Sequence, residues 1–106
     1  MPSDTALPIE HEMLAEKASA LARAGENLAA ALAAVARVES ELAAASTGDR
    51  PAFATRKREA RDLAAERLWF LLVQREAIGL LHHEGMLREY GVPRDVRFLA
   101  GPRRRR

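Results

Sequence analysis

Two groups near opposite ends of the sequence have side chains that could bind a metal ion or a small polar ligand. One contains His11 and Glu12, and the other contains His82 and His83. Helical bundles build metal sites from carboxylates and imidazoles on facing helices, and two antiparallel helices would bring these groups to the same end. The residues three positions before the two histidines are glycine and leucine, so the Glu-x-x-His pair typical of such sites is absent. We therefore predict no metal and no cofactor, and keep a metal-binding or ligand-binding bundle as an alternative.

A second polar group interrupts an apolar stretch. Gln74, Arg75 and Glu76 follow six consecutive apolar residues, and apolar residues resume directly after them. This segment could form a buried network that binds a small polar ligand. It could also form a polar layer that fixes the register of packed helices, as polar residues do in coiled coils. We favour the polar layer.

Positive charge is concentrated in the second half of the chain. Residues 1–49 carry three basic and eight acidic side chains, whereas residues 50–106 carry fourteen basic and seven acidic ones. Four of the basic residues form a tail, Arg103 to Arg106, and basic tails bind phosphate through counterion release. The sequence contains no nucleic-acid reader motif and no interleaved stacking aromatics. Weak nucleic-acid binding by this tail is therefore the second alternative.

The composition argues against several classes of protein. The chain has 106 residues and no cysteine, which fits one domain without a disulfide framework or a thiolate zinc site. The N-terminus lacks the basic and apolar regions of a signal peptide, and no uncharged apolar run reaches the roughly 18 residues of a membrane span. No nucleophile–base pattern, phosphate-binding loop or metalloprotease motif occurs. We therefore expect a cytoplasmic protein that is not an enzyme.

The longest predicted element is a helix over residues 7–45. Large apolar residues recur in it at intervals of seven, at Leu14, Leu21, Leu28, Val35 and Leu42. Mostly small residues stand at the second seam position, so the heptad predicts close packing against a partner helix. Residues 46–49 form the predicted turn, because the glycine, aspartate and proline found there end one helix and begin the next.

A second helix is predicted over residues 50–90, followed by a short helical segment over 93–100 and a disordered basic tail over 101–106. The apolar residues of this helix are spaced by threes and fours, and Gly91 with Pro93 predicts its end. The two helices, of about 38 and 40 residues, have matching lengths. The predicted fold class is therefore all-α: one domain formed by a long antiparallel helical hairpin with a short C-terminal turn.

The run from Leu68 to Val73 is the most apolar part of the chain. A helix that carries it is apolar on every side, so one partner helix cannot cover it. We expect an interface with a second copy, and hence a homodimeric four-helix bundle, formed by Leu68, Trp69, Phe70, Leu72 and Val73. The alternative is a monomer whose C-terminal segment folds back over Trp69 and Phe70. Gly25 lies opposite this run in the hairpin and is expected to make room for it.

Three stretches of the sequence carry a family resemblance. They read Ile9-Glu10-x3-Leu14-Ala15-Glu16-Lys17-Ala18, Trp69-x3-Val73-Gln74-Arg75-Glu76-Ala77-x-Gly79-Leu80 and Tyr90-Gly91-Val92-Pro93. Together they resemble a family of small, all-helical bacterial proteins described only as a domain of unknown function. The resemblance spans roughly residues 9–97 and implies no activity, cofactor or catalytic residue. It does imply that the Gln-Arg-Glu and Tyr-Gly-x-Pro segments belong to the domain.

From these observations we expect a non-enzymatic protein-interaction or assembly module that self-associates through its second helix. The expected partners are a second copy of the chain and an unidentified protein. We expect no membrane contact.

Overall fold

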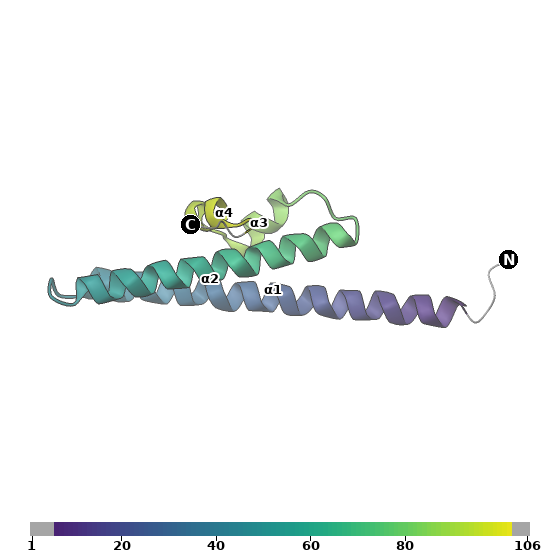
Figure 1. Cartoon of the computed structure of the whole chain (residues 1–106), viewed down its shortest axis with the longest axis horizontal. Helices are drawn as coiled ribbons and strands as arrows, with labels where there is room; N and C mark the ends of the chain where they lie inside the picture. Colours follow the sequence, from purple (N-terminus) through teal and green to yellow (C-terminus); the bar gives the residue numbers. More distant parts are fainter. Residues whose placement is uncertain (1–5, 103–106) are drawn as a thin grey trace.

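The computed structural model describes residues 6–102, with side-chain surroundings from residue 8 onward (Figure 1). This part of the chain measures 70 × 26 × 24 Å. It forms four helices and no strand: α1 (Ala6–Ala44), α2 (Arg50–Ala77), α3 (Glu84–Tyr90) and α4 (Arg94–Leu99). The all-α hairpin with a short C-terminal helix is therefore confirmed. Most of the predicted disordered tail, residues 103–106, lies outside the described residues.

α1 and α2 pack side by side as an antiparallel hairpin (Figure 1). The buried seam contains small residues such as Ala24 and Ala31 of α1, which let the backbones approach closely, between the larger Leu28 and Val35. An ion pair of 3.5 Å between Lys57 Nζ and Glu39 Oε2 shows which residues face each other. The heptad in the sequence therefore predicted the packed side of α1 correctly over its C-terminal two thirds.

α2 ends at Ala77, thirteen residues before the predicted end at residue 90. Gly79 adopts a left-handed backbone with φ of 90°, which glycine reaches without steric cost. The amides of Gly79 and Leu80 then donate to the carbonyls of Glu76 and Arg75, each over 3.0 Å. These bonds satisfy carbonyls that a helix end leaves free. The prediction of one helix over 50–90 was therefore wrong, and the two long helices differ in length.

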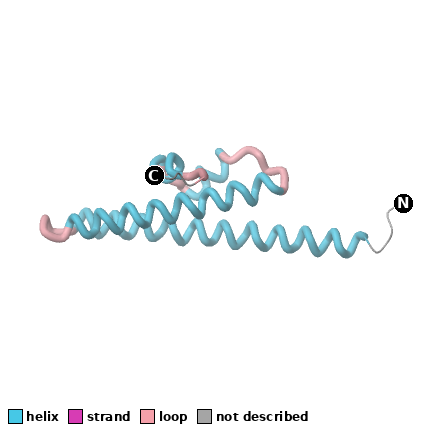
Figure 2. The backbone as a smooth tube through the Cα atoms, in the orientation of Figure 1, coloured by secondary structure: helices cyan, strands magenta, loops and turns pink. Residues whose placement is uncertain are grey.

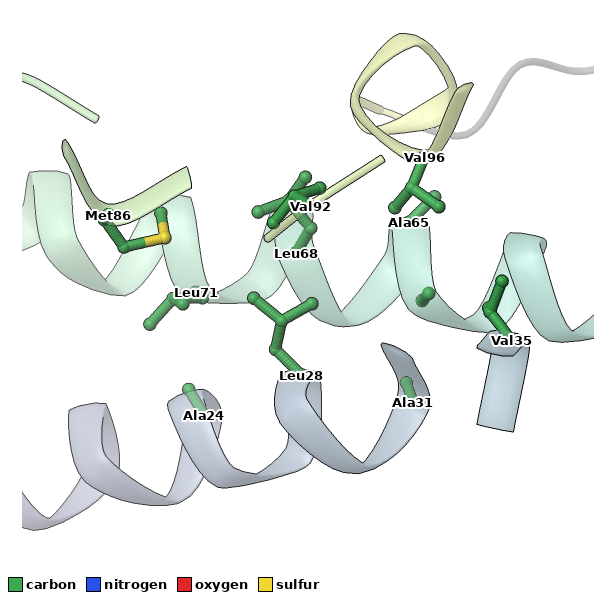
Figure 3. Close-up of a cluster of buried hydrophobic side chains, with 11 residues drawn as sticks. Ala24, Leu28, Ala31, Val35, Ala65, Leu68, Leu71, Met86, Val92 and Val96 are labelled. Atoms are coloured by element: carbon green, nitrogen blue, oxygen red, sulfur yellow. The ribbon is translucent and has the colours of Figure 1, made fainter. Parts of the chain in front are cut away.

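The chain reverses direction after α2 and returns as a third layer. The loop over residues 78–83 lies on the side of α2 that faces away from α1 (Figure 2). α3 ends at Tyr90 and is followed by Gly91, whose φ is 64°, and the Val92 amide donates to the Leu87 carbonyl over 3.0 Å. This is the glycine-terminated helix end that the sequence predicted. Met86, Val92 and Val96 are buried against α2 (Figure 3).

Gly25 makes room for Tyr90 rather than for the apolar run of α2. A methyl group at position 25 would overlap the Tyr90 hydroxyl. Tyr90 is half-buried and packs against the core cluster. The expected packing reason for the glycine is therefore present, but the residue it accommodates comes from the C-terminal layer.

Asp95 anchors α4 to the middle of α2. Its Oδ2 accepts a hydrogen bond of 2.6 Å from Arg61 Nη1, and its Oδ1 accepts one of 2.8 Å from the Val96 amide. The hydrogen bond from Arg61 is the main reason that the pKa of the Asp95 carboxyl lies below its ordinary value, with burial acting in the opposite direction. Docking of α4 therefore uses the ionised form of Asp95.

A double-mutant cycle tests the contact between Gly25 and Tyr90. We expect Gly25→Ala alone to lower the free energy of unfolding, because the new methyl group displaces the Tyr90 ring. In a Tyr90→Phe background the hydroxyl is gone, so Gly25→Ala should stabilise by about 1 kcal/mol through helix propensity. Urea unfolding of the four proteins measures the difference. Equal effects of Gly25→Ala in both backgrounds would contradict the contact.

Acid unfolding tests the Asp95 anchor. The folded-state pKa of Asp95 is lowered, so its contribution is present above the unfolded value of about 3.9 and is lost as the pH falls through the folded value. We expect Asp95→Asn to be less stable than wild type at neutral pH by less than about 1 kcal/mol, because both partners are partly exposed. The difference should shrink as the pH falls below the unfolded value of about 3.9. Urea unfolding at several pH values measures it, and a constant difference would contradict the role of the charge.

Candidate interaction surface

Four large apolar side chains lie exposed on the side of α2 that neither α1 nor the C-terminal layer covers. We call this surface the outer face of α2. Its exposed fractions range from 37% to 52%, and it consists of Leu63, Trp69, Phe70 and Val73. Spacings of three, four and seven residues place these side chains along one side of a helix. Exposed apolar groups of this kind mark sites where proteins bind other proteins.

Two of the five predicted interface residues belong to the inside of the chain. Leu68 is 1% exposed and lies in the core cluster, with Leu28 on one side and Val92 on the other (Figure 3). Leu72 is half-buried and packs against the same cluster. Leu68 was therefore wrongly assigned to an interface, because the C-terminal layer covers that side of α2. An interface role for Trp69, Phe70 and Val73 stays a prediction.

The C-terminal segment does fold back over α2, as the monomer alternative expected. It covers Ala65 and Leu68 rather than Trp69 and Phe70, which remain 37% and 52% exposed. α4 is fixed in this position by Arg61 and buries Val96 completely. The C-terminal layer thus covers the side of the apolar run that carries Leu68. The side that carries Trp69 and Phe70 remains exposed.

Arg75, Glu76 and His83 form a hydrogen-bonded network where α2 ends. Arg75 donates from Nη2 to the His82 carbonyl over 2.9 Å and from Nε to His83 Nδ1 over 3.1 Å. Glu76 Oε2 lies 2.9 Å from His83 Nε2. A guanidinium is always a donor, so Nδ1 of His83 accepts the hydrogen bond from Arg75. Nε2 of His83 then carries the ring hydrogen and donates a hydrogen bond to Glu76. The network ties the loop after α2 to the last turn of the helix.

This network corrects the predicted polar layer. Arg75 and Glu76 bond to the loop that follows α2 instead of lying between packed helices. Gln74 has a different position and lines a shallow groove together with residues of α1. No sequence signal identified His83 as the partner, because its position depends on the chain reversal at Gly79.

The predicted meeting of the two histidine-containing groups does not occur. α2 stops before the histidines, and the loop that carries His82 and His83 turns away from α1 (Figure 1). His11 and Glu12 lie on the part of α1 that extends past the end of α2. Between residues 6 and 102, no three His, Asp or Glu side chains are grouped so that they could hold a metal ion. The metal-binding alternative depended on these two groups lying close together, and that prediction is therefore wrong.

None of the helices in the described part of the chain is both long and apolar enough to cross a membrane. The apolar side chains on the outer face of α2 are interspersed with Glu59, Asp62 and Glu66, which are exposed.

The chain belongs to a family of unknown function, DUF6665, whose family model matches residues 1–103. This confirms the resemblance seen in the three sequence stretches and extends it over nearly the whole chain. No curated protein and no solved structure matches the chain. The family itself names no ligand, partner or reaction.

Removal of the His83 side chain tests the network at the end of α2. We expect His83→Ala to lower the free energy of unfolding by about 1 kcal/mol, because Arg75 and Glu76 each lose a hydrogen-bond partner but can return partly to water. Hydrogen exchange of the Gly79 and Leu80 amides should also become faster. His82 contributes only its carbonyl to the network, so His82→Ala is the matched control. Equal effects of the two substitutions would contradict the assigned role of His83.

Proposed function

We propose that this member of a family of unknown function is a non-enzymatic protein-interaction module that self-associates through the outer face of α2. One observation carries the proposal. Trp69, Phe70, Val73 and Leu63 remain exposed although α2 already packs against α1 and α4. The side chains on this face are therefore not needed for the core and remain available for a partner.

A second copy of the chain is the partner that fits this face most simply. Two hairpins related by a two-fold axis can pack their α2 helices together, and each copy then covers the apolar side chains of the other. α1 and the C-terminal layers of both copies would lie outside this contact. The exposed Glu59, Asp62 and Glu66 lie among these apolar side chains and would also enter the contact.

The polar side chains near this face support the interaction role rather than a catalytic one. Arg75, Glu76 and His83 bond to one another and close the end of α2. Their hydrogen-bonding capacity is thus used in part to hold the backbone. The apolar side chains on the outer face of α2, by contrast, do not hold the backbone in this way.

Matched substitutions at two phenylalanines test the proposal. Phe70 is 52% exposed on the outer face, whereas Phe98 is 88% exposed on α4, away from it. We expect Phe70→Glu to reduce the self-association of the wild type strongly, because burying a carboxylate in an apolar contact is costly. Phe98→Glu makes the same chemical change outside the contact and should behave as wild type.

Light scattering of the eluting protein measures the mass of each variant, and circular dichroism checks that both remain helical. A wild type that stays monomeric at about 100 μM would refute self-association, because its Kd would then lie well above this concentration. An equal loss of association in both variants would refute the outer face of α2 as its site.

A further inference from the structure

Within residues 6–102, no helix packs against the first three turns of α1. The ion pair between Lys57 and Glu39 fixes the register of the hairpin. Ala77, at the end of α2, lies twenty positions after Lys57, and Ser19 lies twenty positions before Glu39. Ala77 is therefore level with Ser19 in the antiparallel hairpin. Residues 8–19 therefore project past α2 (Figure 1), and every one of their side chains is exposed. We call this segment the overhang.

Four residues of the overhang have a spacing that is the same from either end. Glu10, Met13, Leu14 and Lys17 stand at positions i, i+3, i+4 and i+7, which places them on one side of the helix. Suppose that two copies of the helix run antiparallel, with a two-fold axis level with the bond between Met13 and Leu14. Glu10 of each copy is then level with Lys17 of the other. The apolar pair lies at the centre, and one pair of opposite charges lies at each end.

We propose that the overhang binds the overhang of a second copy of this chain, antiparallel and about a two-fold axis. The second overhang would occupy the line that α2 leaves free beyond Ala77. α1 would then have an antiparallel partner along its whole described length. Met13 and Leu14 are 52% and 62% exposed in the single chain, and the contact removes their apolar surface from water, which favours association.

A shallow groove at the end of α2 provides a second point of contact. It has a volume of about 670 Å³ and is lined by Gln74 and by α1 residues between Met13 and Arg23. In the antiparallel register, Ile9 of the second copy is level with Ala18, midway along this part of α1. Ile9 is 58% exposed, and its insertion into the groove would cover it.

Self-complementary charge selects a second copy over an unrelated partner. Only a copy of the same helix necessarily presents a lysine opposite Glu10 and a glutamate opposite Lys17. The contact does not rest on the outer face of α2, because its apolar residues lie on a different helix. The two contacts can therefore be tested separately.

Exchange of the two charges tests the register of the contact. The experiment uses the full chain with Phe70→Glu, so that association through the outer face of α2 is absent. We expect Lys17→Glu to weaken dimerisation about tenfold, because two pairs of like charges replace two pairs of opposite charges. Glu10→Lys should act in the same way, and the double variant E10K/K17E should restore the dimer. Sedimentation equilibrium at low salt measures all four proteins, since salt screens these charges.

Disulfide trapping tests the position of the two-fold axis. The chain contains no cysteine, so a single introduced cysteine can form only an intermolecular disulfide. Met13→Cys lies beside its own copy in the proposed contact, and mild oxidation should convert it to a covalent dimer. Thr47→Cys, exposed in the turn at the opposite end of the hairpin, is the control and should remain largely monomeric.

Three results would overturn the proposal. They are equal disulfide formation at positions 13 and 47, failure of the double charge exchange to restore association, and a Phe70→Glu protein that stays monomeric up to about 100 μM. A Phe70→Glu protein that associates less than wild type but still dimerises, together with efficient trapping at Met13→Cys, would support both surfaces. Trapping at Met13→Cys without any effect of Phe70→Glu on association would support the overhang alone.

Discussion

The burial of α2 on two sides is the constraint on which the rest of the structure depends. Leu68 has Leu28 of α1 on one side and Val92 of the C-terminal layer on the other, and it is 1% exposed (Figure 3). A hairpin alone would bury only one side of such a helix. The chain therefore has to reverse after α2 and return along it, and Gly79 allows the reversal at the necessary point. Small residues on α1, such as Ala24 and Gly25, let both layers approach.

The hairpin was predictable because its signals are local and periodic. The heptad from Leu14 to Leu42 and the turn before Pro51 identify α1, the reversal and the start of α2 without any tertiary information. Gly91 was recognised as a helix end because Pro93 follows it. Gly79 has the same left-handed backbone, but apolar residues continue beyond it at helical spacing. The periodic pattern therefore concealed the reversal.

The tertiary contacts of the C-terminal layer could not be predicted from the hairpin register. Pairing two straight helices places Gly25 opposite the apolar run of α2, whereas the structure places Tyr90 there. The hairpin alone also led us to assign Leu68 to the surface and to place His82 and His83 near His11. The histidine pairing depended on the length of α2, whereas the assignments of Gly25 and Leu68 lacked the C-terminal layer. The exposed side of the apolar run could be identified as unusual from sequence, but its division into a covered and an open side required the third layer.

The difference in length between α1 and α2 makes the molecule elongated, and this has a hydrodynamic consequence. A compact domain of this size has a radius of gyration of about 13 Å, whereas that of this chain is 18.2 Å. Friction in water increases with elongation at constant mass. A single chain therefore leaves a gel-filtration column as early as a heavier globular protein does. It also rotates more slowly end over end than about its long axis, so an attached fluorophore reports different tumbling times for different orientations.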